Sequence, residues 1–235
     1  MRWFISLFTR EYSLSRALLV IFISSSFWGV LWIPLRIIEG LGLNGLWSNF
    51  FFLALPILPL AYLFLRPIWK DKSNWVGYFI IGSCIGMGFA CYLAGLNLGS
   101  VTKTTVLYYL TPAWATLFGI FLLGEKQTFG RWTSILFGLL GCVLVIELDV
   151  RSLSFDYYDI FGFASGLIWS LGSVFVRRFN KIDIASVMLP IYFFGAFITL
   201  IFIYFFKFEA PEALVILKTA LPIFLVSILI FFLSS

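Results

Sequence analysis

The sequence predicts an all-α protein: a polytopic bundle of transmembrane helices with about eight spans. Two observations lead to this fold class. Hydrophobic residues make up 62% of the 235 residues and charged residues only 11%, whereas a soluble domain is about 25% charged. The apolar residues also gather in runs of about 20, the length that a helix needs to cross the hydrocarbon core. These runs do not alternate polar with apolar residues, so they favour helices over a β-barrel.

Charged residues and breaks rich in Gly and Pro divide the chain into the expected spans. Five spans fall within residues 1–150 and three within residues 155–235. The first run is too long for a signal-peptide core and lacks a small-residue cleavage site, so we expect it to remain as a span. In chain order the spans are residues 17–38, 47–65, 75–96, 101–123, 132–146, 160–176, 184–206 and 213–233.

Basic residues are shared unequally between the two sides of the membrane. Eleven lysines and arginines fall on the side of the amino terminus and five on the other, so the positive-inside rule places the amino terminus in the cytoplasm. These orientation signals also explain the net charge of +5, which therefore does not indicate nucleic-acid binding. The larger set is Arg2, Arg10, Arg16, Arg66, Lys70, Lys72, Lys126, Arg131, Arg177, Arg178 and Lys181, and the smaller is Arg36, Lys103, Arg151, Lys207 and Lys218.

The first and sixth spans share a short internal similarity. When Trp28 is aligned with Trp169, Arg36 falls on Arg177, at the same offset of 141 residues. Five spans separate the two copies, and an odd number of crossings turns the second copy upside down in the membrane. Inverted repeats of this kind are typical of secondary transporters, whose substrate site lies near the bilayer midplane between the halves.

Prolines and pairs of small residues also lie within the spans. A proline in a helix removes a backbone donor and favours a kink, although proline is generally more common in membrane helices. The prolines in question are Pro34, Pro56, Pro59, Pro112, Pro190 and Pro222. Gly82 with Gly86, and Gly162 with Gly166, have the four-residue spacing that allows helices to pack closely.

Residues 101–146 read VTKTTVLYYLTPAWATLFGIFLLGEKQTFGRWTSILFGLLGCVLVI. A proline in the fourth span, a glycine-glutamate pair, a basic loop and a glycine-rich fifth span follow one another here. With the Trp28-Gly29 pair of the first span, this order resembles the EamA-type transporters of the drug/metabolite transporter superfamily. The residues that carry the resemblance are Pro112, Gly124, Glu125, Gly130, Gly138 and Gly141.

The resemblance implies two inverted five-helix halves, ten spans altogether, that export or exchange a small metabolite by alternating access at a midplane cavity. It also implies a bacterial inner (plasma) membrane as the location. Residues 1–150 match the first half, and residues 155–235 match an incomplete second half that lacks two spans. The alternative is a non-transporting truncated fragment or accessory membrane subunit, and a membrane-embedded enzyme is a further alternative.

Aromatic and polar residues of four spans are the candidates for binding the small-molecule substrate. Neighbouring side chains on a helix point about 100° apart, so at most one of the two adjacent tyrosines faces the centre of a pocket. The backbone before Pro112 is loosened and could offer carbonyl groups to a ligand. The candidates are Trp28, Tyr92, Lys103, Tyr108, Tyr109, Pro112, Trp169 and Ser173.

Two charged residues near span ends each have two interpretations. Lys103 either reaches the membrane interface with its long side chain or faces the cavity as a cation that attracts anionic metabolites. Glu125, which with Gly124 forms the glycine-glutamate motif, either couples transport to protons or forms a structural salt bridge.

The chain contains no histidine, and its three cysteines, Cys84, Cys91 and Cys142, lack the spacing of a metal site. No pair of acidic residues lies within the spans. We therefore expect no enzyme activity, no catalytic residue, no metal and no cofactor. The partners that we expect are the lipid bilayer and the substrate, and a homo-oligomer is left open.

Overall fold

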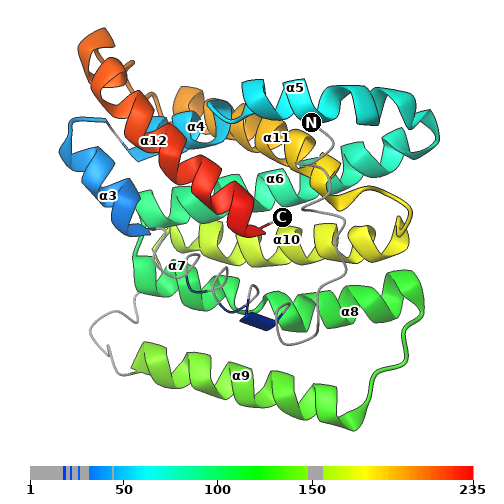
Figure 1. Ribbon diagram of the computed structural model, residues 1–235. Helices are drawn as coiled ribbons and strands as arrows, with labels where there is room; N and C mark the ends of the chain where they lie inside the picture. Colours follow the sequence, from blue (N-terminus) through cyan, green and yellow to red (C-terminus); the bar gives the residue numbers. More distant parts are fainter. Residues whose placement is uncertain are drawn as a thin grey trace.

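A computed structural model describes residues 32–43, 45–147 and 156–234, together with Leu18, Leu19, Phe22 and Ser26 (Figure 1). Within this part of the chain every regular element is helical, which confirms the all-α class. The helices are α3 (Trp32–Gly40), α4 (Gly45–Ala54), α5 (Ile57–Lys70), the 3-10 turn η1 (Lys72–Asn74), α6 (Trp75–Leu98), α7 (Val101–Tyr108), α8 (Thr111–Leu123), α9 (Phe129–Glu147), α10 (Asp159–Arg178), α11 (Ile184–Phe205) and α12 (Ala213–Ser234).

Five stretches of helix are long and apolar enough to cross a membrane. They are Gly45–Lys70, Lys72–Leu98, Val101–Leu123, Asp159–Arg178 and Ile184–Phe205, which confirms five of the predicted spans. The predicted spans at 132–146 and 213–233 are helical as α9 and α12. Of the predicted span at 17–38, α3 covers the end, and most of the remainder lies outside the described residues.

Helix α6 occupies the centre of the bundle, between α10 on one side and α11 on the other (Figure 1). Beyond α11 lie α4 and α5, and beyond α10 lie α7, α8 and finally α9. In the span that contains α6, 72% of an apolar stretch of 18 residues is buried inside the bundle. In the span formed by α7 and α8, only 17% of the corresponding stretch is buried. The centre of the fold is therefore a contact between a helix of the first predicted half and two helices of the second.

Small residues let the backbones of α6 and α11 touch. A Cβ atom added at Gly86 would lie 2.5 Å from the carbonyl oxygen of Ile191 and 2.8 Å from the amide nitrogen of Gly195. One added at Gly82 would lie 2.5 Å from the ring of Pro190. Lipid offers no hydrophobic drive for helix association, so close contacts of this kind hold the bundle together.

Two of the predicted spans are interrupted, each next to a proline. Pro56 lies between α4 and α5, and the break between α7 and α8 at Tyr109 and Leu110 precedes Pro112. Pro190 and Pro222 lie inside α11 and α12, which continue past them. The proline pattern therefore marks two real breaks, and elsewhere the helix tolerates the lost donor.

Helix α9 lies at the edge of the bundle, next to α7 and α8 (Figure 1). None of its side chains that the structure describes is buried. Its glycines Gly138 and Gly141 have no neighbour within 4 Å of an added Cβ atom. In a bilayer this surface faces lipid or another protein, in contrast to the packed glycines of α6.

Replacement of Gly86 by alanine tests the close contact of α6 with α11. The added methyl group meets backbone atoms that cannot turn aside, so we expect a loss of stability of about 1 to 3 kcal/mol. Thermal unfolding in detergent micelles measures it. Gly138→Ala is the matched control, because the same methyl group enters open space in α9. An equal fall in melting temperature for both variants would contradict the packing argument.

Candidate functional site

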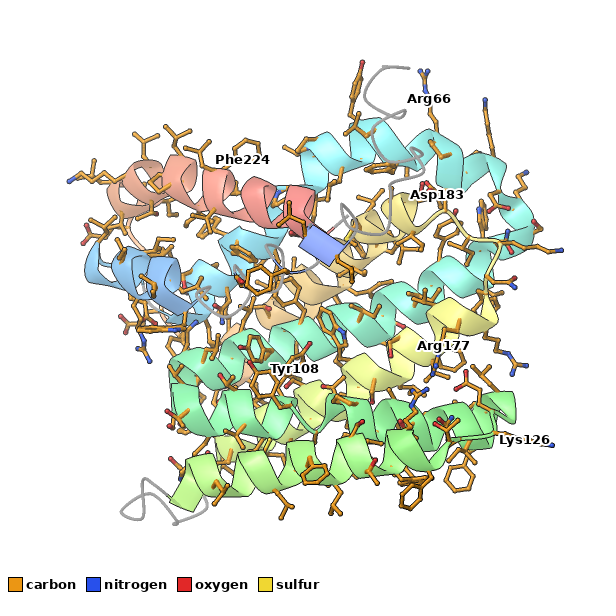
Figure 2. The ribbon with its side chains drawn as sticks, turned by 60° about the horizontal axis from the view of Figure 1, so that its bottom comes forward. Arg66, Tyr108, Lys126, Arg177, Asp183 and Phe224 are labelled. Carbon is orange, nitrogen blue, oxygen red and sulfur yellow. The ribbon has the colours of Figure 1, made fainter. Side chains whose placement is uncertain are left out.

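An aromatic cluster lies between α6, α7, α10 and α11. The ring centroids of Tyr92 and Tyr108 are 4.8 Å apart, and Tyr108 meets Trp169 edge to face at 6.0 Å. Phe89 lies 5.9 Å from Trp169 and 6.4 Å from Tyr192. The structure thus brings together three of the predicted substrate-binding residues, which come from three different helices (Figure 2, near Tyr108).

The position of Trp169 depends on a glycine of the facing helix. A Cβ atom added at Gly88 of α6 would lie 2.9 Å from the amide nitrogen of Trp169. The backbones of α6 and α10 are therefore in direct contact beside the cluster. This contact fixes where the indole ring leaves α10, so the cluster belongs to a rigid part of the fold.

Tyr108, the last residue of α7, and the adjacent Tyr109 point in different directions, as expected from the angle of about 100° between neighbouring side chains on a helix. Tyr108 packs against Tyr92 inside the cluster, with the two ring planes tilted by 48°, whereas Tyr109 is 57% exposed at the surface of the bundle. Only Tyr108 of this pair is placed to touch a ligand in the cluster.

In a regular helix the amide N–H of residue 112 would donate to the carbonyl of Tyr108, four residues earlier. Pro112 has no amide N–H, so this carbonyl lacks its usual donor. The hydroxyl group of Thr111 donates to this carbonyl instead. The backbone of α10 also approaches closely here, since a Cβ atom added at Gly166 would lie 3.0 Å from the same oxygen. The side chain of Pro112 itself is exposed.

Ser173 and Trp28 are also among the predicted binding residues. Ser173 is half-buried one turn further along α10, and its hydroxyl group donates to the carbonyl of Ser170 at 2.8 Å. Trp28 lies outside the described residues.

Lys103 forms an ion pair with Asp159, the first residue of α10. Its ammonium nitrogen lies 3.3 Å from Oδ2 of Asp159, and the two side chains are only 15% and 3% exposed. The same carboxylate oxygen accepts the backbone N–H of Asp156 at 2.9 Å. Both interpretations of Lys103 left out this partner, whose charge offsets that of the lysine.

The glycine-glutamate motif ends α8. Gly124 adopts a left-handed conformation, with φ of +66°, which glycine takes without strain and which caps the helix. Glu125 then turns back toward α10, and its Oε1 lies 3.1 Å from Nη1 of Arg177. Gly119 leaves room for this pair, because a Cβ atom there would lie 2.6 Å from Glu125. Glu125 and Arg177 thus form an ion pair that joins the end of α8 to α10.

Sequence reasoning missed two pairs of residues. Phe89 and Tyr192 complete the aromatic cluster but are two among many aromatic residues in the spans. Asn49 and Asn97 join α4 to α6, with Nδ2 of Asn97 donating to Oδ1 of Asn49 at 2.6 Å. Two amide side chains inside apolar runs were the signal that could have found this pair.

The chain is similar to known membrane transporters. The sequence pattern of the EamA-like transporter family matches residues 15–147. The uncharacterized transporter YoaV of Bacillus subtilis (strain 168) is 26% identical over 196 residues, which cover 79% of this chain and 65% of that protein. The uncharacterized transporter YyaM of the same organism is 27% identical over 138 residues, which cover 56% of this chain and 45% of that protein. The chain thus spans less than two thirds of either relative's length.

A solved crystal structure of another protein shares the fold. Its TM-score is 0.58 at 21% sequence identity, and the match covers 94% of this chain and 79% of the other. At this level of identity the likeness concerns the fold alone.

The bond between Thr111 and the Tyr108 carbonyl can be tested by a double-mutant cycle. Thr111→Val leaves that carbonyl without a donor inside the membrane, which costs about 1 to 3 kcal/mol of stability. In a Pro112→Ala background residue 112 regains its amide N–H, so the same change should cost much less. Thermal unfolding of the four proteins measures the coupling. An equal loss in both backgrounds would show that the hydroxyl group has another role.

Proposed function

Because the chain belongs to the EamA-like transporter family, we propose that it is a secondary transporter that exports or exchanges a small metabolite by alternating access at a midplane site. The observation that carries the proposal is the aromatic cluster around Tyr108 and Trp169. These residues lie near the middle of their spans, where the substrate site of such transporters is found. The cluster also joins α6 and α7 of the first half to α10 and α11 of the second.

The inverted arrangement of the two halves, residues 1–150 and 155–235, is part of this proposal. Two arginines that align in the sequence make similar contacts at opposite ends of the bundle. Arg36 pairs with Glu39 at 3.0 Å and donates to the carbonyl of Leu96 at 3.1 Å. Arg177 pairs with Glu125 and donates to the carbonyl of Ala115 at 3.4 Å. Helices α3 and α10, which carry them, run in opposite directions (Figure 1), which supports an inverted repeat.

The chemistry of the cluster suggests how a substrate is bound. The rings of Tyr92, Tyr108 and Trp169, which contact one another, would give apolar contact area to a substrate that enters the cluster, and the tyrosine hydroxyl groups can donate or accept a hydrogen bond. Lys103 is held by Asp159, so the positive charge that it could offer to a substrate is offset. Metabolites with an apolar or aromatic part and no net charge therefore fit this site best.

Reconstitution of the purified protein into liposomes tests the function directly. Liposomes loaded with a panel of metabolites should release or exchange at least one of them faster than empty liposomes do. Transport of none, by protein that is folded and inserted, would favour the accessory-subunit alternative. Turnover of a substrate into a new compound would favour the enzyme.

The two adjacent tyrosines provide a matched test of the site. Tyr108→Leu removes a ring from the cluster, and aromatic pairs contribute about 0.5 to 1.5 kcal/mol each, so the KM for the transported substrate should rise roughly 2- to 10-fold. Tyr109→Leu changes the same group at an exposed position and should leave KM unchanged. A larger effect at Tyr109 would place the substrate elsewhere.

Labelling with an impermeant reagent tests the proposed orientation. Lys126 and Arg177 lie at one end of the bundle (Figure 2), which we propose faces the cytoplasm because basic residues gather there. In a background without the native cysteines, Tyr157→Cys should react with impermeant maleimide in intact cells. Lys126→Cys should react only after the membrane is opened. The reverse pattern would invert the assignment.

A further inference from the structure

Helices α7 and α8 run beside α10 in the same direction, and each end of this contact carries one ion pair. Lys103 and Asp159 form the pair at the end where α7 and α10 begin, here named the Lys103 end. Glu125 and Arg177 form the pair where α8 and α10 finish, here named the Arg177 end. Figure 1 shows the three helices side by side, and Figure 2 shows Arg177 and Lys126 at the same end.

The ion pair at the Lys103 end is largely buried. The side chain of Asp159 is 3% exposed, and its carboxylate sits at the amino terminus of α10, where the helix dipole favours a negative charge. The backbones also touch beside this pair, because a Cβ atom added at Gly162 would lie 2.8 Å from Cα of Thr104. Separation of the helices here would leave a charged group without its partner in an apolar surrounding, which is costly.

The Arg177 end is open to water. Arg177 and Glu125 are 38% and 27% exposed, and ion pairs in contact with solvent contribute little. Arg177 and Arg178 also donate to the carbonyls of Ala115 at 3.4 Å and Leu122 at 3.2 Å. Water can replace these bonds when α8 moves away, so these arginines and carbonyls stay hydrogen-bonded when this end opens.

The helix break between the two ends supplies a hinge. Helix α7 ends at Tyr108 and α8 begins at Thr111, and Pro112 prevents the regular ladder from bridging the gap. Helix α8 packs against α10 and is otherwise little buried. It can therefore tilt about this break while α7 stays in contact with α10.

We propose that the two ion pairs are gates of unequal strength, and that α8 swings away from α10 at the Arg177 end while the Lys103 end stays closed. The proposal rests on the alternating-access function stated above, and it adds which end opens in the absence of substrate. The aromatic cluster beside the hinge would then be reached from the Arg177 end.

Distances between spin labels, measured by pulsed electron paramagnetic resonance, test the proposal. The protein is placed in lipid nanodiscs without substrate, in a background that lacks the native cysteines. One pair of labels, Lys126→Cys with Lys181→Cys, reports on the Arg177 end. A second pair, Thr102→Cys with Tyr157→Cys, reports on the Lys103 end. All four side chains are exposed, so the labels do not disturb the packing.

At the Arg177 end we expect a broad distribution of label-to-label distances, with a second, longer distance for the open state. At the Lys103 end we expect a single narrow distance. Glu125→Gln should increase the share of the longer distance, and the charge swap E125R with R177E should restore the original share. Asp159→Asn should broaden the distribution at the Lys103 end. Asp156→Asn is its matched control, because it removes an exposed carboxylate from the same turn of chain and should change nothing.

A narrow distance distribution at the Arg177 end together with a broad one at the Lys103 end would overturn the proposal. Equal effects of D159N and D156N on the distances at the Lys103 end would also overturn it. If D159N does not fold, the double variant K103M with D159N removes both charges and leaves no unpaired ion. Because no substrate is needed, the outcome is independent of the transport assay. Unequal gating in a protein that transports nothing would refute the proposed function alone, and transport without unequal gating would refute the gates alone.

Discussion

The hydrocarbon core of a bilayer neither donates nor accepts hydrogen bonds, and the structure depends on this constraint at every level. Each backbone amide inside the membrane must find its partner within its own helix, which is why the apolar stretches that the structure describes are helical. Where a proline removes a donor, the released carbonyl needs another one, and Thr111 supplies it for Tyr108. The same constraint places the ion pairs of Lys103 and Arg177 at the two ends of the bundle.

Helix association in lipid has to rely on close packing, and α6 shows how the sequence provides it. Gly86 meets the backbone of α11, and Gly88 meets the backbone of α10. A helix with glycines on two faces can touch two neighbours without losing its own hydrogen bonds. Helices α10 and α11 therefore both meet α6, and the aromatic cluster lies in the seam between these helices.

The sequence predicts the spans well because their signal is local. Length and apolar composition alone locate the stretches that became α6, α10 and α11. The pattern also predicts that Tyr108 and Tyr109 diverge, because the helix geometry fixes their angle. The interruption between α7 and α8 was foreseen only as a kink, since how far a helix unwinds at Pro112 depends on whether Thr111 and α10 can take over the freed carbonyl.

Contacts between distant segments were not predictable in the same way. Lys103 and Asp159 are 56 residues apart, and nothing in either local pattern points to the other. The cluster was found only in part for the same reason: Phe89 and Tyr192 are ordinary aromatic residues in apolar runs until the fold places them beside Trp169. A charged residue in these spans is rare and therefore easy to notice, but the sequence does not show which residue it pairs with.

The distribution of charge along the bundle also bears on how a substrate could pass. The middle of the seam offers rings and hydroxyl groups, whereas the ion pairs stand at its ends. A neutral solute at Tyr108 would meet rings and hydroxyl groups, while Lys103 and Arg177 are each paired with a carboxylate. The main barrier to its passage would then be the separation of the helices at either end. The pair at Asp159 is more buried than the pair at Arg177, and separating buried charges costs more than separating solvated ones, so the two proposed gates differ in the work required to open them.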